Sequence, residues 1–479
     1  MQDDIGGVAR RRPPGRTLPR SLWLSWLAGG TAYSALSLFL LANYRQPPFD
    51  LALYDQTIWL IGHGFDFNTV AGIHIFGAHM SPVLYLLAPL SWLGGGAVPE
   101  LVFQGFWIAA GVIPAYLLGN LIDRGRLFAG LYLLHPAIAS GVAFGTRPWN
   151  LAVPVMMLFA WLVASRASLW KLMLVGMIIA LFREDMVLWI LLVVVVGWRS
   201  SGLTLTKAFA ILAGPVAWSS LALIVFLPEF SPIDTYIYQQ VLDPAAPELN
   251  VPFGAAATIL RLMYLAIPFG LAAIWDNRAL ILATAAIPLA GLVLKGGFAL
   301  TPFFQYEMHF IPLFLVIIAT GNSMRLNPRM VAVGLVTMSV LIGPLRPWNL
   351  AGAAPPLAID RSTVQTWRTL EETLVPLLDH GESAALPSLL VTHFAERRQI
   401  TIFPYPFDAV VPEPYAMDCP NPQVVVVPPS VEWETPGWDA AVDDYSVVFA
   451  VAGFTGYVLD EASPSTGCRY PQTRPGPES

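Results

Sequence analysis

The chain has 479 residues, 56% of them hydrophobic and 12% charged, and it carries a formal net charge of −6. Soluble proteins contain about 25% charged residues. The composition therefore excludes an ordinary soluble protein and predicts a polytopic α-helical membrane protein that contacts the lipid bilayer. The acidic balance gives no reason to expect a nucleic-acid partner.

The first predicted transmembrane helix covers residues 22–43. This segment is uncharged, and at about 1.5 Å per residue it reaches roughly 33 Å, enough to cross a bilayer. It is too long for a cleaved signal peptide, so we expect it to remain as an anchor. Residues 1–21 hold five arginines, and the positive-inside rule places this tail in the cytoplasm. The next loop, residues 44–98, is therefore expected outside.

Residues 80–97 are apolar but short, and they contain two prolines. If they crossed the membrane, the next basic turn, DRGR at 123–126, would lie outside, against the positive-inside rule. An interfacial hairpin at 80–97 instead puts this turn and the later basic turns in the cytoplasm. We therefore expect a hairpin here rather than a span.

With that assignment the chain crosses the plasma membrane eleven times and leaves its C-terminal end outside. The predicted spans are 22–43, 99–120, 127–145, 149–165, 169–182, 186–198, 208–227, 255–275, 279–296, 302–320 and 330–345.

A soluble extracytoplasmic domain is predicted for residues 346–463, because the composition changes there. From residue 346 to the end there are seven arginines, seventeen acidic residues and no lysine. The apolar runs SLLVTHF, QVVVVPP and YSVVFAVAG are strand-sized and 361–379 has a helical pattern, so a small α/β domain is expected. Cys419 and Cys468 both lie in this outer part and are candidates for a disulfide in an oxidising compartment. The tail, 464–479, is expected to be disordered.

Charged residues near predicted spans point to function, because charge is costly in the bilayer. Most of them share one depth, the predicted outer face. They are Asp50, Asp55, Arg147, Arg183, Glu184, Asp185, Arg261, Lys295, Glu307 and His309. Cationic side chains at headgroup level suit a lipid phosphate, and carboxylates beside them suit a general base.

Several of these residues also have a purely structural interpretation. Asp50 could cap the helix that follows, and Asp55 could face water. Arg183 and Asp185 could form a salt bridge within a tight hairpin, and Arg261 could extend to lipid headgroups.

The first outer loop also holds three histidines, His63, His74 and His79. Their spacing of eleven and five residues fits no familiar zinc site, so no metal site is assigned to them.

Several segments resemble, in order, the motifs of a prokaryotic membrane-protein family of unknown function. The segments are FDLALYDQTIW, GAHMSPVLYLLAPL, LHPAI, REDM and YEMHFIPLFLVIIATG, followed by LLVTHFAERRQITIFP in the outer domain. The family motifs are FDxxxxDQ, H-x-S-P, (K/R)ED and a late histidine beside an aromatic residue. That family is in turn similar to the GT-C superfamily of integral membrane glycosyltransferases, whose first outer loop has an acidic residue near span one and a P-x-x-Y-x-L segment, here beginning at Pro82.

This resemblance implies a GT-C-like bundle over residues 22–345 and a role for several of the polar residues. Asp50 matches the catalytic base, Glu184 and Asp185 match a second acidic site at an outer turn, and Arg183 and His309 match positions that hold the donor phosphate. From their place at the same predicted face, we add Asp55 to the acidic catalytic set and Arg261 and Lys295 to the candidates for binding the phosphate. The remaining substrate contacts would come from His79, Gln56, Arg147 and Glu307. Many members carry a histidine near the end of span three, where this chain has TRPWN and hence Arg147.

The resemblance implies an enzyme that transfers a sugar from a polyprenyl-phosphate donor to an extracytoplasmic glycan, lipid or protein. No cofactor is assigned; the chain lacks a compact DxD motif, and a divalent cation is left open. Two other classes remain: a transporter or flippase of lipid-linked precursors, and a non-enzymatic scaffold for envelope assembly. A transporter favours ionisable groups near the bilayer midplane, whereas these lie near one face.

Overall fold

The computed structural model describes most of the helical bundle and much of the outer domain. The described residues are 18–231, 263–265, 267–269, 305–320, 327–341, 343, 345–346, 357, 359–379, 381–406, 421–429 and 435–460, without the side chains of 199–201, 305 and 306. The predicted spans 255–275 and 279–296 lie almost wholly outside them. Cys419, Cys468, Arg261 and Lys295, as well as both chain ends, also lie outside this description.

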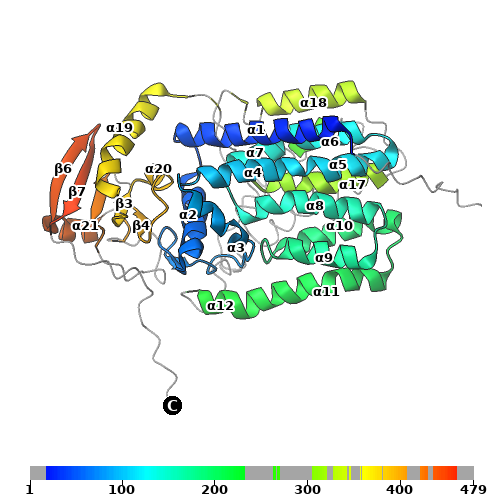
Figure 1. Ribbon diagram of the computed structural model, residues 1–479, viewed down its shortest axis with the longest axis horizontal. Coiled ribbons are helices and arrows are strands. Elements are labelled where there is room, and N and C mark those ends of the chain that lie inside the picture. Colours follow the sequence, from blue (N-terminus) through cyan, green and yellow to red (C-terminus); the bar gives the residue numbers. More distant parts are fainter. Residues whose placement is uncertain are drawn as a thin grey trace, which may run out of the picture.

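The protein is mostly helical, with a bundle at one end and a sheet at the other (Figure 1). Within the described residues, four segments are long and apolar enough to cross a membrane: Arg20–Ala42, Val98–Ile122, Gly125–Ala143 and Leu205–Phe230. The bundle comprises α1 (Arg20–Ala42), α4 (Val98–Ala110), α5 (Val112–Gly119), η2 (Asn120–Ile122), α6 (Gly125–Leu134), α7 (Pro136–Ala143), α8 (Pro148–Ala164), α9 (Leu169–Ala180), α10 (Met186–Ser201), α11 (Leu205–Leu221), η3 (Ala222–Phe226), α12 (Leu227–Phe230), η5 (Ile267–Phe269), η6 (Gln305–His309), α17 (Phe310–Thr320) and α18 (Pro328–Leu341).

These helices fall within a few residues of nine of the predicted spans, because charge and proline mark their ends. The total of eleven spans stays a prediction. One predicted span, 127–145, is broken at His135, which precedes Pro136. Proline has no N–H and starts α7 at its first position, while the His135 side chain accepts a hydrogen bond from Ala137 N at 3.1 Å.

Helices α1 and α4 pack closely at small residues. A Cβ at Gly30 would lie 2.3 Å from the Phe106 ring, and one at Gly105 would lie 2.3 Å from Ser34 Oγ. Trp26 Nε1 also donates to the Phe106 carbonyl at 3.0 Å. Close approach at small residues is a usual way for transmembrane helices to associate, and here it fixes α1 to α4.

The first outer loop folds into a helix, α2 (Pro48–His63), a short hairpin of β1 (Phe67–Asn68) and β2 (Ile73–His74), and a brief helical segment, α3 (Leu84–Leu87) with η1 (Ala88–Leu93). Helix α2 lies between the bundle and the outer domain (Figure 1). The Leu84–Leu93 segment is apolar and shorter than the four candidate spans, and the interfacial position of the 80–97 region stays a prediction.

The outer domain contains a five-stranded sheet in the order β4-β3-β5-β7-β6. Its strands are β3 (Ala384–Leu386), β4 (Ile400–Ile402), β5 (Val424–Val427), β6 (Tyr445–Val451) and β7 (Phe454–Leu459), and its helices are α19 (Arg361–Leu378), α20 (Ser388–Val391), α21 (Pro436–Ala441) and η7 (Val442–Asp444). Strand β3 is parallel to β4 and β5, whereas β7 is antiparallel to β5 and β6. The α/β prediction is therefore confirmed for the described part of this region.

One strand prediction was wrong. The run SLLVTHF begins with α20 instead of a strand, because β3 ends at Leu386, before Pro387. Leu390 and Val391 are both fully buried, so a buried helical turn explains the apolar run as well as a buried strand would. A short apolar run does not by itself distinguish a strand from a buried helix.

Gln56 joins the first outer loop to the outer domain. Its Nε2 donates to Thr69 Oγ1 at 2.8 Å and to the Arg397 carbonyl at 3.1 Å, and its Oε1 accepts from the backbone N–H of Thr69 and Val70, both at 3.0 Å. Thr69 Oγ1 in turn accepts from Ile400 N at 2.8 Å. The amide is fully buried, and all four of its bonding positions are used within the protein.

Replacing Gln56 by leucine should loosen the outer domain from the loop. The variant leaves buried N–H groups at Thr69 and Val70 without their acceptor, at a cost of at least about 2 kcal/mol. We expect a lower thermal midpoint and faster proteolytic release of the outer domain. The exposed Gln365→Leu on α19 is the matched control; equal behaviour of the two variants would contradict this role.

Candidate functional site

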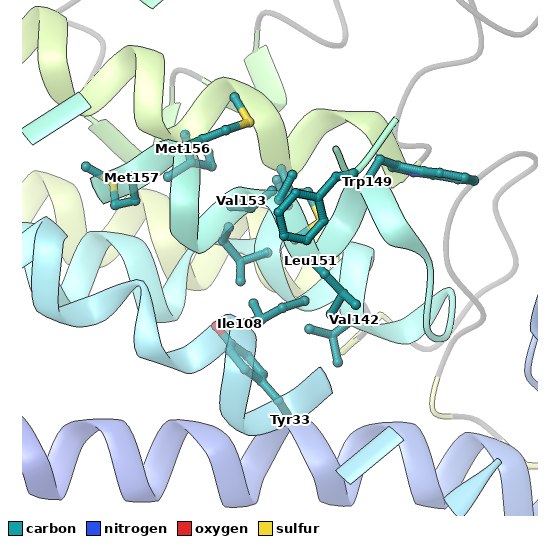
Figure 2. Close-up of a cluster of buried hydrophobic side chains, with 14 of the residues drawn as sticks. Tyr33, Ile108, Val142, Trp149, Leu151, Val153, Met156 and Met157 are labelled. Carbon is teal, nitrogen blue, oxygen red and sulfur yellow. The ribbon is translucent and has the colours of Figure 1, made fainter. Parts of the chain in front are cut away.

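Trp149 lies at the centre of the polar residues that face the first outer loop. Its side chain is 3% exposed and belongs to the cluster of buried hydrophobic side chains that fills the bundle (Figure 2). The Cζ atoms of Arg183 and Arg147 lie 4.6 and 5.6 Å from its ring centroid. The rings of Tyr54 and His79 contact it edge-on, with centroids 5.7 and 6.0 Å away. One indole thus brings together α2, the loop after β2, the start of α8 and the α9–α10 turn.

Asp50 lies in the first turn of α2 and binds Arg147. Arg147 Nη2 donates to Asp50 Oδ2 at 2.5 Å; the Arg147 side chain is fully buried, whereas that of Asp50 is 31% exposed. The helix N-cap is Pro47, and no side chain caps this end. The capping interpretation of Asp50 is therefore wrong, and its carboxylate instead bridges a buried cation and the solvent.

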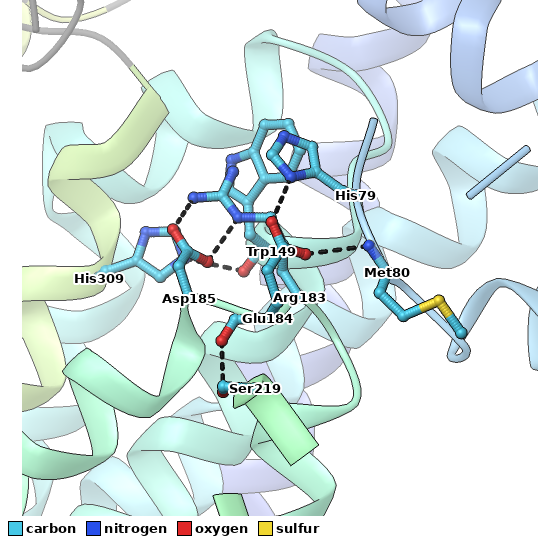
Figure 3. Close-up of polar contacts among 8 residues, drawn as sticks. All are labelled: His79, Met80, Trp149, Arg183, Glu184, Asp185, Ser219 and His309. Atoms are coloured by element: carbon cyan, nitrogen blue, oxygen red, sulfur yellow. Dashed lines mark hydrogen bonds and ion pairs between the residues drawn. The ribbon is translucent and has the colours of Figure 1, made fainter. Parts of the chain in front are cut away.

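The α9–α10 turn carries two ionic contacts that point in different directions (Figure 3). Arg183 Nε donates to Asp185 Oδ1 at 2.6 Å, and Arg183 Nη2 donates to Asp185 Oδ2. Glu184 instead contacts the loop: His79 Nδ1 lies 2.7 Å from Glu184 Oε1, and Met80 N donates to Glu184 Oε2 at 3.0 Å. The predicted hairpin salt bridge is confirmed, and Arg183 also faces Trp149.

Asp185 stays ionised readily in this setting. Burial alone would raise its pKa, but the ion pair with Arg183 and the nearby His79 and His309 lower the pKa below its ordinary value. The Arg183 guanidinium that stabilises this carboxylate would also attract another anion.

His309 and Glu307 enter from η6, which packs against α8. His309 Nε2 donates to the Trp149 carbonyl at 2.8 Å, and the His309 ring stacks on Trp189 at 5.1 Å. Both His309 and Glu307 are buried. His309 therefore belongs to the group around Trp149.

The structure brings together seven of the fourteen predicted residues, in what we call the Trp149 cluster. Its predicted members are Asp50, His79, Arg147, Arg183, Glu184, Asp185 and His309. Gln56 instead bonds to the outer domain, and Glu307 is buried beside the cluster in η6. Arg261, Lys295, Cys419 and Cys468 lie outside the described residues. Partly exposed carboxylates beside guanidinium groups allow proton acceptance and anion binding within one site.

Asp55 lies in a second place, at the junction of α2, α4 and the outer domain. It is fully buried, so the alternative that it faces water is wrong. Neither of its carboxylate oxygens, nor Oε2 of the buried Glu100, has a hydrogen-bond partner in the described part of the chain. Burial and the nearby Glu396 carboxylate raise the pKa of Asp55 well above its usual range. Asp55 therefore favours its neutral form.

The three loop histidines have separate partners. His63 stacks on Trp59 at 4.2 Å, His74 stacks on Phe230 at 4.0 Å, and His79 bonds Glu184. Among the residues that the structure describes, no three His, Cys, Asp or Glu side chains are placed to hold a metal ion.

Trp149, Glu100 and Glu396 were missed by sequence reasoning. Trp149 is one of sixteen tryptophans, and tryptophan usually marks membrane interfaces. The sequence signal that distinguishes Trp149 is its place in TRPWN, two residues after Arg147. Glu100 lies at the start of α4, where an acidic residue is favoured by the helix dipole.

A family described as "Predicted membrane protein (DUF2079)" matches residues 43–444 of the chain. No curated protein matches it, and no solved structure matches it. The expected family of membrane proteins of unknown function is thereby confirmed, and the wider likeness to GT-C enzymes stays a prediction.

Removing the Trp149 side chain should destabilise the whole cluster. Trp149→Ala deletes the ring on which Arg147 and Arg183 pack, and we expect a loss of about 3–5 kcal/mol in the free energy of unfolding. Unfolding in mixed detergent micelles measures it. Trp170→Ala removes a tryptophan that is 61% exposed and should change the free energy of unfolding little. Equal losses of stability in the two variants would show that Trp149 does not hold the cluster together.

Asp55 should make stability depend on pH. Because its pKa is raised in the folded protein, its contribution to stability is greatest below the ordinary value of 3.8 and is lost as the pH rises toward the folded-state pKa. Asp55→Asn should therefore raise the thermal midpoint at pH 7 to 8, and the gain should disappear near pH 4. The exposed Asp443→Asn serves as control, and a gain that is independent of pH would refute the raised pKa.

Proposed function

The chain belongs to this family of predicted membrane proteins, and we propose that it is a glycosyltransferase of the GT-C type. It would transfer a sugar from a polyprenyl-phosphate-linked donor to an extracytoplasmic acceptor. The eleven-span topology and the extracytoplasmic position of the outer domain are part of this proposal.

The observation that carries the proposal is the contact of two arginines with one indole ring. Arg147 forms an ion pair with the partly exposed carboxylate of Asp50, and Arg183 forms an ion pair with Asp185. Both guanidinium groups also contact the Trp149 ring. A sugar transferase with a phosphate leaving group needs fixed positive charge beside a general base. The Trp149 cluster supplies both within one group of side chains.

In the proposed reaction, Arg183 and His309 bind the donor phosphate, with Arg261 and Lys295 as further candidates. Phosphate oxygens would replace the Asp185 carboxylate on the planar guanidinium of Arg183, which can bind either anion through two N–H groups. His79, Arg147 and Glu307 are the remaining candidates for substrate contact.

Asp50 would take the proton of the acceptor hydroxyl as its oxygen attacks the anomeric carbon. A new C–O bond forms, the bond from that carbon to the phosphate oxygen breaks, and the electron pair leaves with the lipid phosphate. The positive charge of Arg183 stabilises this leaving group. The Asp50 side chain is 31% exposed, so an acceptor could reach it from the aqueous side.

Asp50→Asn should lower kcat for transfer of a labelled sugar by about 10²- to 10⁴-fold, the usual contribution of a general base. The KM for the donor should change little, because Asp50 does not bind its phosphate. The assay uses the full chain in nanodiscs with polyprenyl-phosphate sugars. Retained turnover in Asp50→Asn would rule out Asp50 as the base.

Since Arg147 is buried, losing its partner carboxylate risks unfolding. Asp50→Glu retains the negative charge and shifts the carboxylate by one methylene, so it should fold normally and still lose turnover. Asp66→Asn, an exposed acid of the same loop, is the control with full activity. Absence of any sugar transfer by the wild type with a wide donor panel would favour a transporter or a scaffold.

A further inference from the structure

A groove of about 1110 Å³ runs along the first transmembrane helix. It is lined by α1 from Ser21 to Phe39, by α6 and by Ser339 of α18, which Figure 1 shows alongside α1. Only 33% of the apolar stretch of α1 is buried within the protein. The groove therefore lies on a helix that faces the lipid phase.

Small side chains produce this groove. On the α1 side it is lined by Ser25, Ala28, Gly29 and Ala32, and on the α6 side by Gly130. A Cβ at Gly130 would have no atom within 4 Å, so the glycine leaves open space that a larger residue would fill. Helices α1 and α6 meet at Leu133, whose carbonyl accepts from Tyr33 Oη at 2.6 Å.

The lining is apolar except for serines, tyrosines and one cation. That cation is Arg126, near the beginning of α6, and it lies at the same end of the groove as Ser21, in the first turn of α1. Arg126 is exposed and has no hydrogen bond or ion pair with the described part of the chain. At the other end the lining includes Phe39 and Leu357. The groove thus has one charged end and one apolar end.

The dimensions and the charge fit a lipid. From Ser21 to Phe39, α1 rises about 27 Å, close to the roughly 30 Å hydrocarbon thickness of a bilayer. An acyl chain from the leaflet on the Arg126 side can therefore lie in the part of the groove that begins at Arg126. Its phosphate would meet the guanidinium at the membrane surface, where such contacts are favourable.

We propose that the α1–α6–α18 groove is a binding site for one anionic glycerophospholipid, with its phosphate on Arg126 and an acyl chain along Gly130 and Ala32. The lipid comes from the leaflet at the Arg126 end, which the positive-inside rule predicts to be cytoplasmic. This site is separate from the Trp149 cluster, and it does not depend on the proposed sugar transfer.

The test measures lipid retained by the full chain in native mass spectrometry, from micelles that contain phosphatidylglycerol or phosphatidylcholine. We expect one retained phosphatidylglycerol, a preference over phosphatidylcholine, and about a tenfold loss of retention in Arg126→Gln, as for one lost charge-assisted contact. Gly130→Leu should abolish retention, because leucine fills the groove from a helical position with free space.

Matched controls separate this site from general lipid contact. Arg124→Gln removes an exposed cation two residues away that does not line the groove. Gly214→Leu adds the same side chain to α11, where a Cβ meets only Met177 Sδ at 3.6 Å. Both should retain the lipid. Equal retention in all variants, equal retention of the two lipids, or displacement of phosphatidylglycerol by equimolar polyprenyl phosphate would overturn the proposal.

Discussion

The fully buried guanidinium of Arg147 is the constraint on which the arrangement of the Trp149 cluster depends. A buried charge without a partner costs several kcal/mol, and in this protein the partner is Asp50, in the first turn of α2. The ion pair therefore fixes where α2 begins. Phe144 and Trp149 offer ring faces to the same guanidinium, with centroids 5.2 and 5.6 Å from its Cζ, and Trp149 extends this arrangement to Arg183 and His79.

Once α2 is fixed at Asp50, its helical geometry determines what its later residues can reach. Positions five and six residues further on are rotated by about 140° and 240° around the axis. Asp55 and Gln56 therefore face away from Arg147, toward α4 and the outer domain. Gln56 bonds the Arg397 carbonyl of that domain. One helix thus connects the candidate catalytic group, Asp50, with the domain that would cover the site. A movement of the outer domain would therefore displace Asp50.

The sequence predicted the positions of the helices well, but it did not predict which residues contact one another. Apolar length and charged turns locate α8, α10 and α11 closely, because both signals are local. The contacts that build the site are not local: Asp50 and Arg147 are 97 residues apart, and Met80 and Glu184 are 104 apart. A common depth predicted that the charged residues share one face. It could not predict that Gln56 would be fully bonded inside the protein, or that a tryptophan would organise the cluster.

Asp50 and Asp55 show why neighbours, and not residue type, decide what a carboxyl group can do. Asp50 is partly exposed and has a cation as partner. Asp55 is fully buried, faces the Glu396 carboxylate, and has a raised pKa. A carboxyl group that is neutral and closed to solvent is poorly suited to take a proton from a hydroxyl on the aqueous side, whereas the partly exposed carboxylate of Asp50 suits the proposed role of a base. The sequence motif FDxxxxDQ thus contains two aspartates with different tasks: the first belongs to the site, and the second to the junction with the outer domain.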